Sequence, residues 1–356
     1  MPHQQFMQRC IALAQNASGF TSPNPMVGAV LVHNGNIISE GWHHYYGAAH
    51  AEVNCLDNLP AALKHLIPEA TMYVNLEPCA HYGLTPPCAN RLVAEKVQRV
   101  VIANTDPFAE VNGKGIAILR QNNIEVVTGV QQQEGYWLNR RFFAFHTRKR
   151  PYIILKWAQT PDGFIGTPNK GPVRITGAEC QTLSHKWRTQ ESAIMVGFTT
   201  ALNDDPQLTA RLHTGKQPLR IAIDRNKLIP HTHNLHNIDA ATWIVNETDE
   251  TVLGNVHYIK VSFDDALLNA LLARMYDARL LSVIVEGGAH LLESFIAAGL
   301  WDEARIFTGG PALNEGVAAP ILNGGTTAFS TSVGQDLLQV QTNPASGFVY
   351  PVGADL

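Results

Sequence analysis

The sequence predicts an α/β protein of two globular domains, and three observations support this. The chain has 356 residues, more than the roughly 100–200 residues of an ordinary single domain. Hydrophobic residues make up 45% and charged residues 16% of it, which is enough apolar surface for packed cores. Strand-like and helix-like patterns alternate along both halves, as in sheets covered by helices.

The first half predicts a sheet that begins with a β-hairpin. Apolar runs at 26–33 and 36–42 flank the dipeptide Asn34-Gly35, which is typical of a tight hairpin turn. A helix is expected to start at His50. Further strands are predicted at 71–77, 99–105 and 124–130, and further helices at 87–96 and 113–122.

The boundary between the domains is predicted between Gln131 and Arg150. There the pattern turns polar and then basic, and Pro151 opens a new apolar run at 151–158. We therefore expect a first domain over 1–148 and a second over 149–356.

The second half again predicts alternating elements. Strands are expected at 151–158, 191–197, 218–224, 241–246, 255–261 and 280–288, and amphipathic helices at 178–190, 264–276 and 289–299. This alternation favours a mostly parallel sheet with helices on its faces.

Charge and cysteine content argue against several classes of protein. The net charge is −4 and no dense Lys/Arg stripe is present, so a nucleic-acid partner is not expected. The N-terminus has no signal-peptide pattern and no apolar run is long enough for a membrane, so we expect a cytoplasmic protein. Five cysteines without a secretory signal suggest thiols and metal ligands, with Cys10, Cys55 and Cys180 as ordinary buried thiols.

One set of residues has the composition of a catalytic zinc site. His50, Cys79 and Cys88 supply an imidazole and two thiolates, and three protein ligands leave a fourth position for water. Glu52 lies two residues past His50 at the expected helix start. It is placed to shuttle a proton without ligating the metal.

The spacing resembles the H-x-E and P-C-x-x-C signature of zinc-dependent nucleobase deaminases. Here eight residues separate Cys79 from Cys88, so a turn that includes His81 must bring the two thiolates together. The alternatives are a helix-start histidine with two core thiols, or a structural zinc. A structural site is more often closed by a fourth Cys or His.

Longer segments resemble a known family. HAE, LEPCAHYGLTPPC, PNPMVGAVLV and DPFAEVNGKG in the first half are similar to the bifunctional riboflavin-biosynthesis deaminase/reductase. KWAQTPDGFIG, RITG, HKWRTQESAIMVGFTTALNDDPQLTAR and IVEGGAHLLESF continue the resemblance in the second half. It implies a cytidine-deaminase-like three-layer domain followed by a dihydrofolate-reductase-like α/β domain, with Zn²⁺ and NADPH as cofactors.

The resemblance also implies the first reaction and the residues around it. The family removes the 2-amino group of 2,5-diamino-6-ribosylamino-4(3H)-pyrimidinone 5′-phosphate by hydrolysis. It places four residues near this substrate: Asn24, His43, His81 and Asp106. Each has an alternative reading: Asn24 and Asp106 are also natural turn residues, and the two histidines also suit a surface.

Two positions depart from the family pattern. Leu84 stands where the family usually has Lys or Arg, so a phosphate contact is lost or supplied elsewhere. Lys114, at a predicted helix start, is a candidate for that contact or a solvated lysine. Arg174 stands where the family often has Trp, and its guanidinium is able to stack on the cofactor or bind its 2′-phosphate.

The resemblance further implies the reductase site, in which hydride from NADPH is delivered to C1 of the opened ribose. Cofactor contacts fall on Ala158, Arg174, Thr200, Asp204 and the Gly288 turn, and substrate contacts on Arg188, Leu208, Arg211 and Glu286. The Gly288 turn follows a predicted strand and suits a phosphate at a helix N-terminus, although a tight turn alone also uses glycines. Arg188 and Arg211 suit phosphate recognition, although Arg188 also fits the exposed end of a helix.

Three functional hypotheses remain at this point. The first is the two-step enzyme on a small pyrimidine nucleotide, and we expect it to be a homo-oligomer. The second is a deaminase only, with a non-catalytic or altered second half. The third is a zinc-containing nucleic-acid-binding or editing protein, which the charge pattern disfavours.

Overall fold

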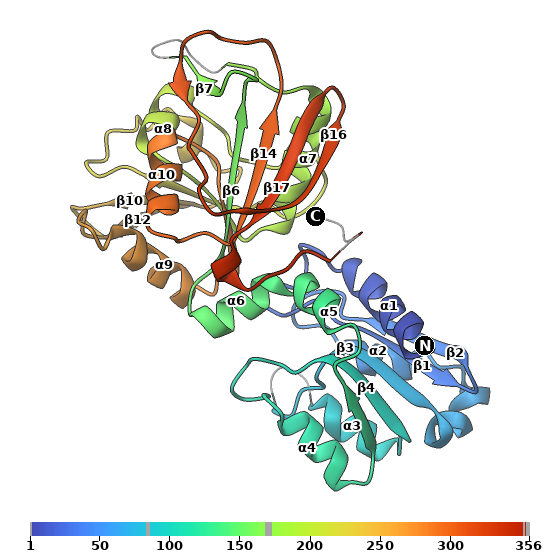
Figure 1. The fold of residues 1–356 in the computed structure, drawn as a ribbon. Helices are drawn as coiled ribbons and strands as arrows, with labels where there is room; N and C mark the ends of the chain where they lie inside the picture. Colours follow the sequence, from blue (N-terminus) through green and yellow to red (C-terminus); the bar gives the residue numbers. More distant parts are fainter. Residues whose placement is uncertain (1, 83–85, 168–172, 352, 354–356) are drawn as a thin grey trace. The chain divides into compact units, whose positions relative to one another are not determined.

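The computed structural model describes residues 2–82, 86–167, 173–351 and 353. The chain divides into two compact units, one comprising Met1–Thr147 together with Pro351–Leu356 and the other spanning Arg148–Tyr350. Figure 1 colours both along the sequence. Each described helix falls short of the length and apolar character that a membrane span requires. Cys10, Cys55 and Cys180 are buried free thiols, as predicted.

The first unit contains one mixed sheet with the strand order β2-β1-β3-β4-β5. The strand β1 pairs antiparallel with β2 and β3, and β3, β4 and β5 run parallel. Its strands are β1 (Gly28–His33), β2 (Asn36–Trp42), β3 (Thr71–Leu76), β4 (Arg99–Asn104) and β5 (Glu125–Thr128). Its helices are α1 (Pro2–Gln15), α2 (Ala51–Asp57), the 3₁₀ helix η1 (Ala61–Glu69), α3 (Cys88–Ala94), α4 (Lys114–Gln121), α5 (Gln132–Leu138) and α6 (Arg140–Arg148).

Helices cover both faces of this sheet because neighbouring strand residues point to opposite sides. Val30 and Val32 pack against α1. Ala29 and Leu31 pack in the other cluster, which includes buried residues of α2, α3 and α4. The predicted three-layer arrangement of the first domain is therefore confirmed, and so is the hairpin at Asn34-Gly35.

The second unit has one long sheet with the strand order β11-β12-β10-β9-β8-β13-β6-β14-β17-β16. The run from β12 to β14 is parallel, and β11, β17 and β16 pair antiparallel. Its strands are β6 (Tyr152–Gln159), β8 (Ala193–Val196), β9 (Leu219–Ile223), β10 (Thr242–Asn246), β11 (Thr251–Leu253), β12 (Val256–Lys260), β13 (Ser282–Val285), β14 (Glu303–Thr308), β16 (Thr326–Val333) and β17 (Asp336–Thr342). A small separate sheet joins β7 (Phe164–Gly166) to β15 (Val317–Ala318).

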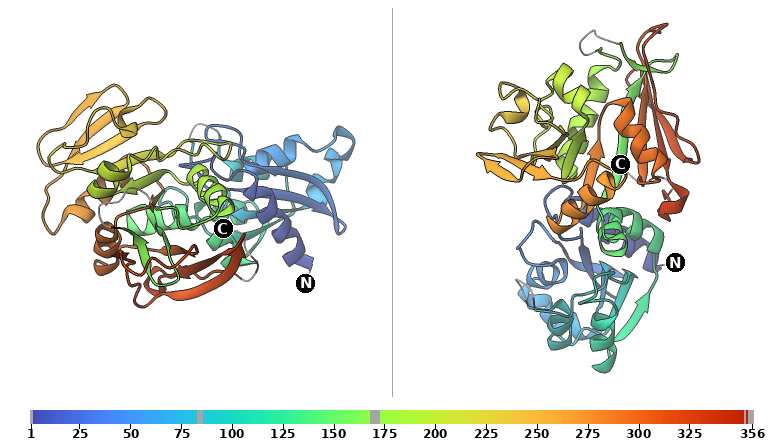
Figure 2. Two further views of the ribbon diagram at one scale, coloured as in Figure 1. Left: turned by 90° about the horizontal axis from the view of Figure 1, so that it is seen from above. Right: turned by 90° about the vertical axis from the view of Figure 1, so that its left-hand side faces the viewer.

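The helices of the second unit lie on both faces of the long sheet (Figure 2). They are α7 (Ala178–Gln190), α8 (Phe198–Asp204), α9 (Leu267–Asp277) and α10 (Ala289–Ala297), with short 3₁₀ turns η2 (Asn234–His236) and η3 (Pro344–Ser346). α9 and α10 pack on Val283 and Val285 of β13. Trp187 of α7 stacks on Phe307 of β14. The neighbouring residue Ile306 packs in the cluster that includes residues of α9 and α10, so α7 lies on the opposite face of the sheet.

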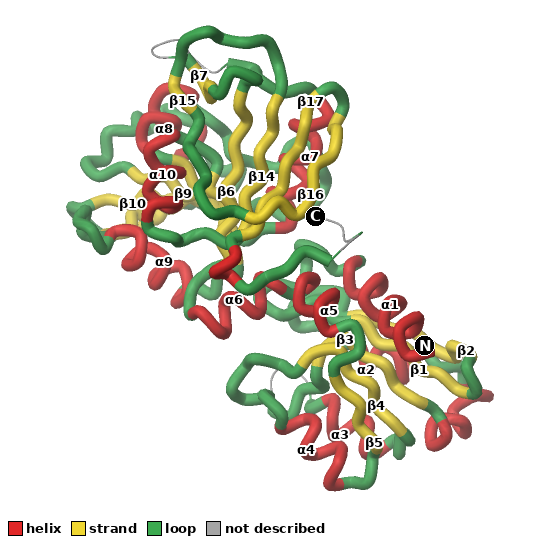
Figure 3. Tube along the Cα trace, viewed as in Figure 1, coloured by secondary structure: helices red, strands yellow, loops and turns green. Residues whose placement is uncertain are grey.

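Several elements are absent from the predictions. The segment 131–150, which the pattern marks as a boundary, forms α5 and α6. α6 is basic, yet it buries Phe142, Phe143 and Phe145, so its polar composition hides an apolar face. α1 and the strands β14, β16 and β17 are also unpredicted. Figure 3 shows β6, β14, β17 and β16 side by side at one end of the sheet.

Arg220, on β9, is fully buried and holds a long loop in place. Its guanidinium donates to the carbonyl oxygens of Asn234 (2.8 Å), Asn237 (2.8 Å) and Ala240 (2.6 Å) and to Asn237 Oδ1 (2.9 Å). The carbonyl of Gln207 also accepts from Arg220, at 3.4 Å. The side chain thus joins the segment before β9 to the segment after it.

Candidate metal centre and reductase site

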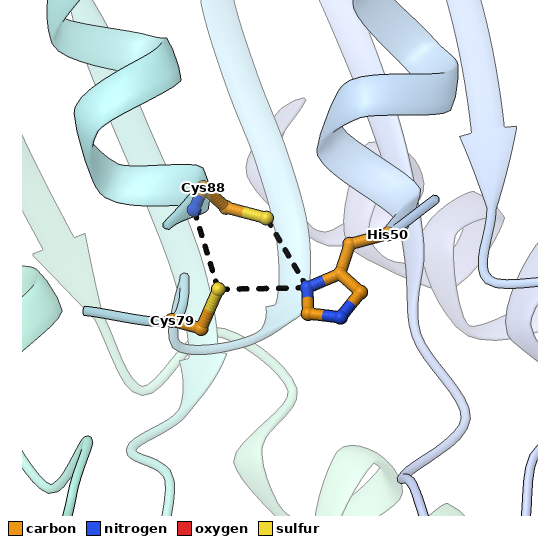
Figure 4. Close-up of side chains that lie close together, drawn as sticks. All are labelled: His50, Cys79 and Cys88. Carbon is orange, nitrogen blue, oxygen red and sulfur yellow. Dashed lines mark hydrogen bonds between the residues drawn. The ribbon is translucent and has the colours of Figure 1, made fainter. Parts of the chain in front are cut away.

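Three side chains from separate elements converge in the first unit (Figure 4). His50 precedes α2, Cys79 follows β3, and Cys88 begins α3. The His50 Nδ1 atom lies 3.5 Å from Cys79 Sγ and 3.3 Å from Cys88 Sγ. All three ligand atoms lie within 4.8 Å of one another, which is close enough to share one ion.

The backbone around these residues is held by local hydrogen bonds. The Cys88 N–H donates to Cys79 Sγ at 3.2 Å, and the Ala89 N–H donates to the Cys79 carbonyl at 3.2 Å. These two hydrogen bonds join the two ends of the eight-residue segment between the cysteines. On the other side, Asn54 Nδ2 donates to the Ala49 carbonyl at 3.2 Å, beside His50.

The protonation of the cysteines fits a soft metal cation. A hydrogen bond from Cys88 and the proximity of His50 lower the pKa of Cys79 to about 4. The hydrogen bond with Cys79 and burial raise the pKa of Cys88 well above its usual range. Cys79 is therefore favoured as a thiolate, the form of cysteine that ligates a metal. An imidazole and two thiolates form a donor set that zinc prefers.

Glu52 lies beside this centre and is not one of the three ligands. Its side chain is buried in the first turn of α2, and its carboxyl interacts with the Cys88 thiol. Burial and the charge of Cys79 raise the pKa of Glu52 above the ordinary glutamate value. A raised pKa makes a carboxylate a stronger base, which suits a group that accepts and returns a proton.

Asn24 and His43 meet next to His50. Asn24 Nδ2 lies 3.2 Å from His43 Nε2, and His43 Nδ1 lies 3.1 Å from the Ala49 carbonyl oxygen. The rings of His43 and His50 contact edge-on, with centroids 5.3 Å apart. Burial lowers the pKa of His43, so its imidazole is neutral.

His81 and Asp106 meet through Phe108. The Phe108 ring contacts His81 with centroids 5.5 Å apart, and the Phe108 N–H donates to Asp106 Oδ1 at 2.8 Å. Burial raises the pKa of Asp106 to about 7, and the charge of Cys79 adds to this effect. The structure thus places Asn24 and His43 beside His50, and brings His81 and Asp106 together at Phe108.

Glu77 is a supporting residue that the sequence analysis did not identify. Its buried carboxylate accepts from the N–H groups of Asp106 (3.2 Å), Gly113 (3.0 Å) and Ile116 (3.1 Å). It therefore holds the loop that carries Asp106 and the first turn of α4. In the sequence, its position two residues before Cys79 is the one feature that points to a role at this site.

Two positions concern phosphate binding. Leu84 lies outside the described residues. Lys114 is the first residue of α4, and its side chain is exposed.

In the second unit, several of the implied cofactor residues lie at the carboxyl ends of neighbouring parallel strands. Gly287 and Gly288 follow β13 with φ of 154° and 75°, conformations that favour glycine. An added Cβ on Gly288 would meet Thr200 Oγ1 of α8 at 3.4 Å, so this hydroxyl faces the glycine turn. Ala158 lies near the end of β6, which neighbours β13. Ligands in open α/β sheets bind at this edge.

The implied substrate residues of the reductase include a buried ion pair. Arg188 donates from Nη2 to Glu286 Oε2 at 2.7 Å, and Lys156 Nζ lies 3.7 Å from the same oxygen. Although burial opposes ionisation, Arg188 and Lys156 lower the pKa of Glu286 to about 2. Arg188 is therefore a buried ion-pair partner and not the exposed end of a helix.

His185 lies in the same positive surroundings. Burial, followed by the charges of Arg188 and Arg211, lowers the pKa of His185 to about 4. Its Nδ1 accepts from the Leu212 N–H at 3.3 Å, next to Arg211. The neutral imidazole thus holds the segment that carries Arg211. His185 was not identified from the sequence.

The remaining three residues lie in different surroundings. Leu208 is buried with a left-handed backbone (φ 54°). Asp204 is exposed at the end of α8. Arg174 donates to the Thr176 carbonyl at 3.4 Å, and no hydrogen bond or ion pair between described residues joins it to the Gly288 turn.

Comparisons with known proteins agree with both units. Residues 1–104 match the family model of the cytidine and deoxycytidylate deaminase zinc-binding region. Residues 151–338 match that of the RibD C-terminal domain. The riboflavin biosynthesis protein RibD of Aquifex aeolicus is 37% identical over 321 residues, covering 88% of this chain and 89% of that protein. RibD of Bacillus amyloliquefaciens is 35% identical, over 99% of this chain and 94% of that protein.

Solved structures show the same relationship across both units. A diaminohydroxyphosphoribosylaminopyrimidine deaminase/5-amino-6-(5-phosphoribosylamino)uracil reductase from Thermotoga maritima has a TM-score of 0.86 and 30% identity, covering 96% of this chain and 99% of that chain. RibD of Acinetobacter baumannii has a TM-score of 0.86 and 31% identity, covering 96% and 98%.

A three-layer unit with a His/Cys/Cys centre, followed by an α/β unit with a glycine turn, defines a zinc deaminase joined to a reductase. The chain belongs to the RibD family of bifunctional riboflavin-biosynthesis enzymes.

The family membership settles several expectations. The cytidine-deaminase-like and dihydrofolate-reductase-like folds are confirmed, as are hydrolase and oxidoreductase activities on small molecules with zinc and NADPH as cofactors. The deaminase-only alternative is wrong, because the reductase domain is matched over 151–338 and full-length relatives carry both domains.

Proposed function

We propose that the first unit removes the 2-amino group from 2,5-diamino-6-ribosylamino-4(3H)-pyrimidinone 5′-phosphate. The second unit then uses NADPH to reduce the ribosyl group of the deaminated product to a ribityl group. One observation carries the proposal: His50, Cys79 and Cys88 converge with the buried carboxyl of Glu52 beside them. The Thermotoga maritima relative is described by deaminase and reductase activities on such compounds.

In the deaminase, the protein positions a proton shuttle and a polar binding edge. His50, Cys79 and Cys88 would hold the zinc ion, which would bring the pKa of a bound water near neutrality. Glu52 takes one proton from this water and gives it to the ring nitrogen. It then takes the second proton of the attacking oxygen and gives it to the leaving amino group, so the C–N bond breaks, ammonia departs and the carbonyl forms.

Four further residues are proposed to hold the polar groups of the ring and the ribose: Asn24, His43, His81 and Asp106. Their positions around the centre support this role. A buried polar group left without a partner would penalise analogues that lack the matching group.

In the reductase, the glycine turn after β13 and the positive cluster of Lys156, Arg188 and Arg211 have separate proposed roles. Gly288, Thr200, Ala158, Asp204 and Arg174 are assigned to NADPH, which supplies the hydride. Arg188, Leu208 and Arg211 are assigned to the substrate. Glu286, also assigned there, holds the Arg188 guanidinium in place. Because Glu286 neutralises one positive charge, Lys156 and Arg211 leave the cluster with a net attraction for a phosphate.

We also propose a cytoplasmic location and a homo-oligomeric state. Zinc ligation requires Cys79 and Cys88 as free thiolates, which a reducing compartment maintains. No nucleic-acid or membrane partner is proposed, in keeping with the net charge of −4. Light scattering of the purified full chain will measure the oligomeric state.

The experiment that tests the proposed function is incubation of the full chain with the diaminopyrimidine nucleotide, with and without NADPH, followed by product mass. Exchange of an amine for a carbonyl without NADPH is expected from the first site. A further gain of two hydrogens with NADPH is expected from the second. An unchanged substrate with zinc-loaded, folded protein would refute the substrate assignment.

A further inference from the structure

Phe108 contacts two residues that lie on different loops of the deaminase unit. Its ring meets the His81 ring at 5.5 Å with an interplanar angle of 69°, an edge-to-face arrangement. Its N–H donates to Asp106 Oδ1 at 2.8 Å. His81 belongs to the segment between the two cysteines, and Asp106 follows β4.

The imidazole of His81 depends on this contact. No hydrogen bond from a described residue holds the ring, and its Nδ1 is buried without a partner. The half-buried Phe108 ring packs edge-on against it. Phe108 is itself supported from the other side by His146 of α6, whose ring centroid lies 5.2 Å away. The His146 ring in turn packs on Phe142 at 4.4 Å.

These contacts form an aromatic column of His81, Phe108, His146 and Phe142 that runs from the metal-binding loop to α6. We propose that Phe108 is a positioning residue of the deaminase, which orients the imidazole of His81 for binding the pyrimidine nucleotide. This inference rests on the proposed function, because it takes His81 as a substrate-binding residue.

Restraint of the His81 ring before binding lowers the entropic cost of binding the substrate. An imidazole without hydrogen bonds loses rotational freedom when a substrate fixes it, which weakens binding unless the ring is already held. Phe108 supplies that restraint in the free enzyme. Loss of the ring should therefore raise KM and change kcat little, since no hydrogen bond or ring contact among the described residues joins Phe108 to the metal ligands or Glu52.

The test uses Phe108→Leu and Phe108→Tyr in the full chain. Both variants keep the backbone N–H that donates to Asp106, so any change in KM reports the change in the ring. Phe108→Leu is expected to raise the deaminase KM about three- to tenfold, while Phe108→Tyr keeps the edge contact and stays within about twofold of wild type. Zinc content and reduction of the separately supplied deaminated intermediate are expected to stay unchanged.

Two controls separate positioning from general damage. Phe6→Ala removes a buried ring that packs on Tyr73, away from the column, and is expected to lower Tm without changing KM. Phe108→Leu in a His81→Ala background is expected to add no further increase in KM, because the effect passes through His81.

The possible results are distinct. A wild-type KM in Phe108→Leu, or an equal additional increase in the His81→Ala background, would overturn the role of Phe108 while leaving the proposed function intact. Failure of the wild-type enzyme to convert the diaminopyrimidine nucleotide would overturn both.

Discussion

Arg188 binds both carboxylate oxygens of Glu286, from Nε to Oε1 at 3.2 Å and from Nη2 to Oε2 at 2.7 Å. The two residues lie 98 positions apart, on α7 and directly after β13. Arg188 also donates to the Thr209 carbonyl at 3.0 Å. The pair therefore fixes a helix, a strand end and the segment leading to Arg211 in one arrangement.

The first prediction concerns the pH dependence of this pair. The folded pKa of Glu286 is about 2, below its ordinary value of 4.5. A lowered carboxyl pKa stabilises the folded state above pH 4.5, and this contribution is lost as pH falls toward 2. Its size is about 3 kcal/mol at neutral pH.

Hydrogen exchange of the β13 and α7 amides between pH 5 and 3 will measure this loss of protection. In Glu286→Gln the same pH interval should change protection much less, because the titrating group is gone. Equal acid sensitivity in the variant and the wild type would contradict the assignment.

The second prediction concerns the proton shuttle. Glu52→Gln is expected to keep zinc and to lower the deaminase kcat by about a hundredfold or more, because the amide cannot transfer the proton. Metal analysis and a steady-state assay will measure the two effects. Glu95→Gln, directly after α3 and paired with Arg91, is the matched control. Near wild-type turnover by Glu52→Gln would refute the role.

The third prediction concerns the metal ligands. Cys88→Ser is expected to lower zinc affinity by at least about tenfold and to abolish deamination, because a hydroxyl replaces a thiolate ligand. Cys55→Ala removes another buried thiol, on α2, and should keep zinc. Zinc retained by Cys88→Ser at wild-type affinity would show that Cys88 is not a ligand.

The fourth prediction concerns Gly115, at the start of α4. A Cβ there would lie 2.0 Å from the carbonyl oxygen of Pro78, the residue before Cys79. Gly115→Ala must therefore displace this backbone, and we expect a loss of about 1–3 kcal/mol in stability with weaker zinc binding. Thermal unfolding with and without a chelator will measure both. Ala117→Ser, exposed on the same helix, should show neither effect.

Local patterns were sufficient for much of the fold and for the metal ligands. The dipeptide Asn34-Gly35 marks the hairpin because both residues take positive φ, here 49° and 77°. His50 marks a helix start because the apolar pattern begins after it. His50, Glu52, Cys79 and Cys88 are close in sequence and have distinctive chemistry, so their spacing was informative.

Long-range partners were not predictable from one sequence. Nothing near Arg188 indicates that Glu286 will bind it, and nothing near Glu77 indicates three backbone donors from 106–116. α6 was missed because its charged residues conceal an aromatic face. The strands β16 and β17 were missed because half-exposed strands carry many polar residues, which weakens the apolar signal.

The guanidinium of Arg220 takes mostly main-chain oxygens as acceptors in the loop over 234–240. Every amino acid provides such an oxygen, so these bonds alone do not restrict the side chains of that loop. Other contacts do, because the Asn237 side-chain oxygen also binds Arg220, the Asn234 amide donates to the Asp205 carbonyl, and Leu235 is buried in the core. Ile238, which is 90% exposed, therefore offers a place to attach a fluorescent reporter or a new recognition group without rebuilding the scaffold.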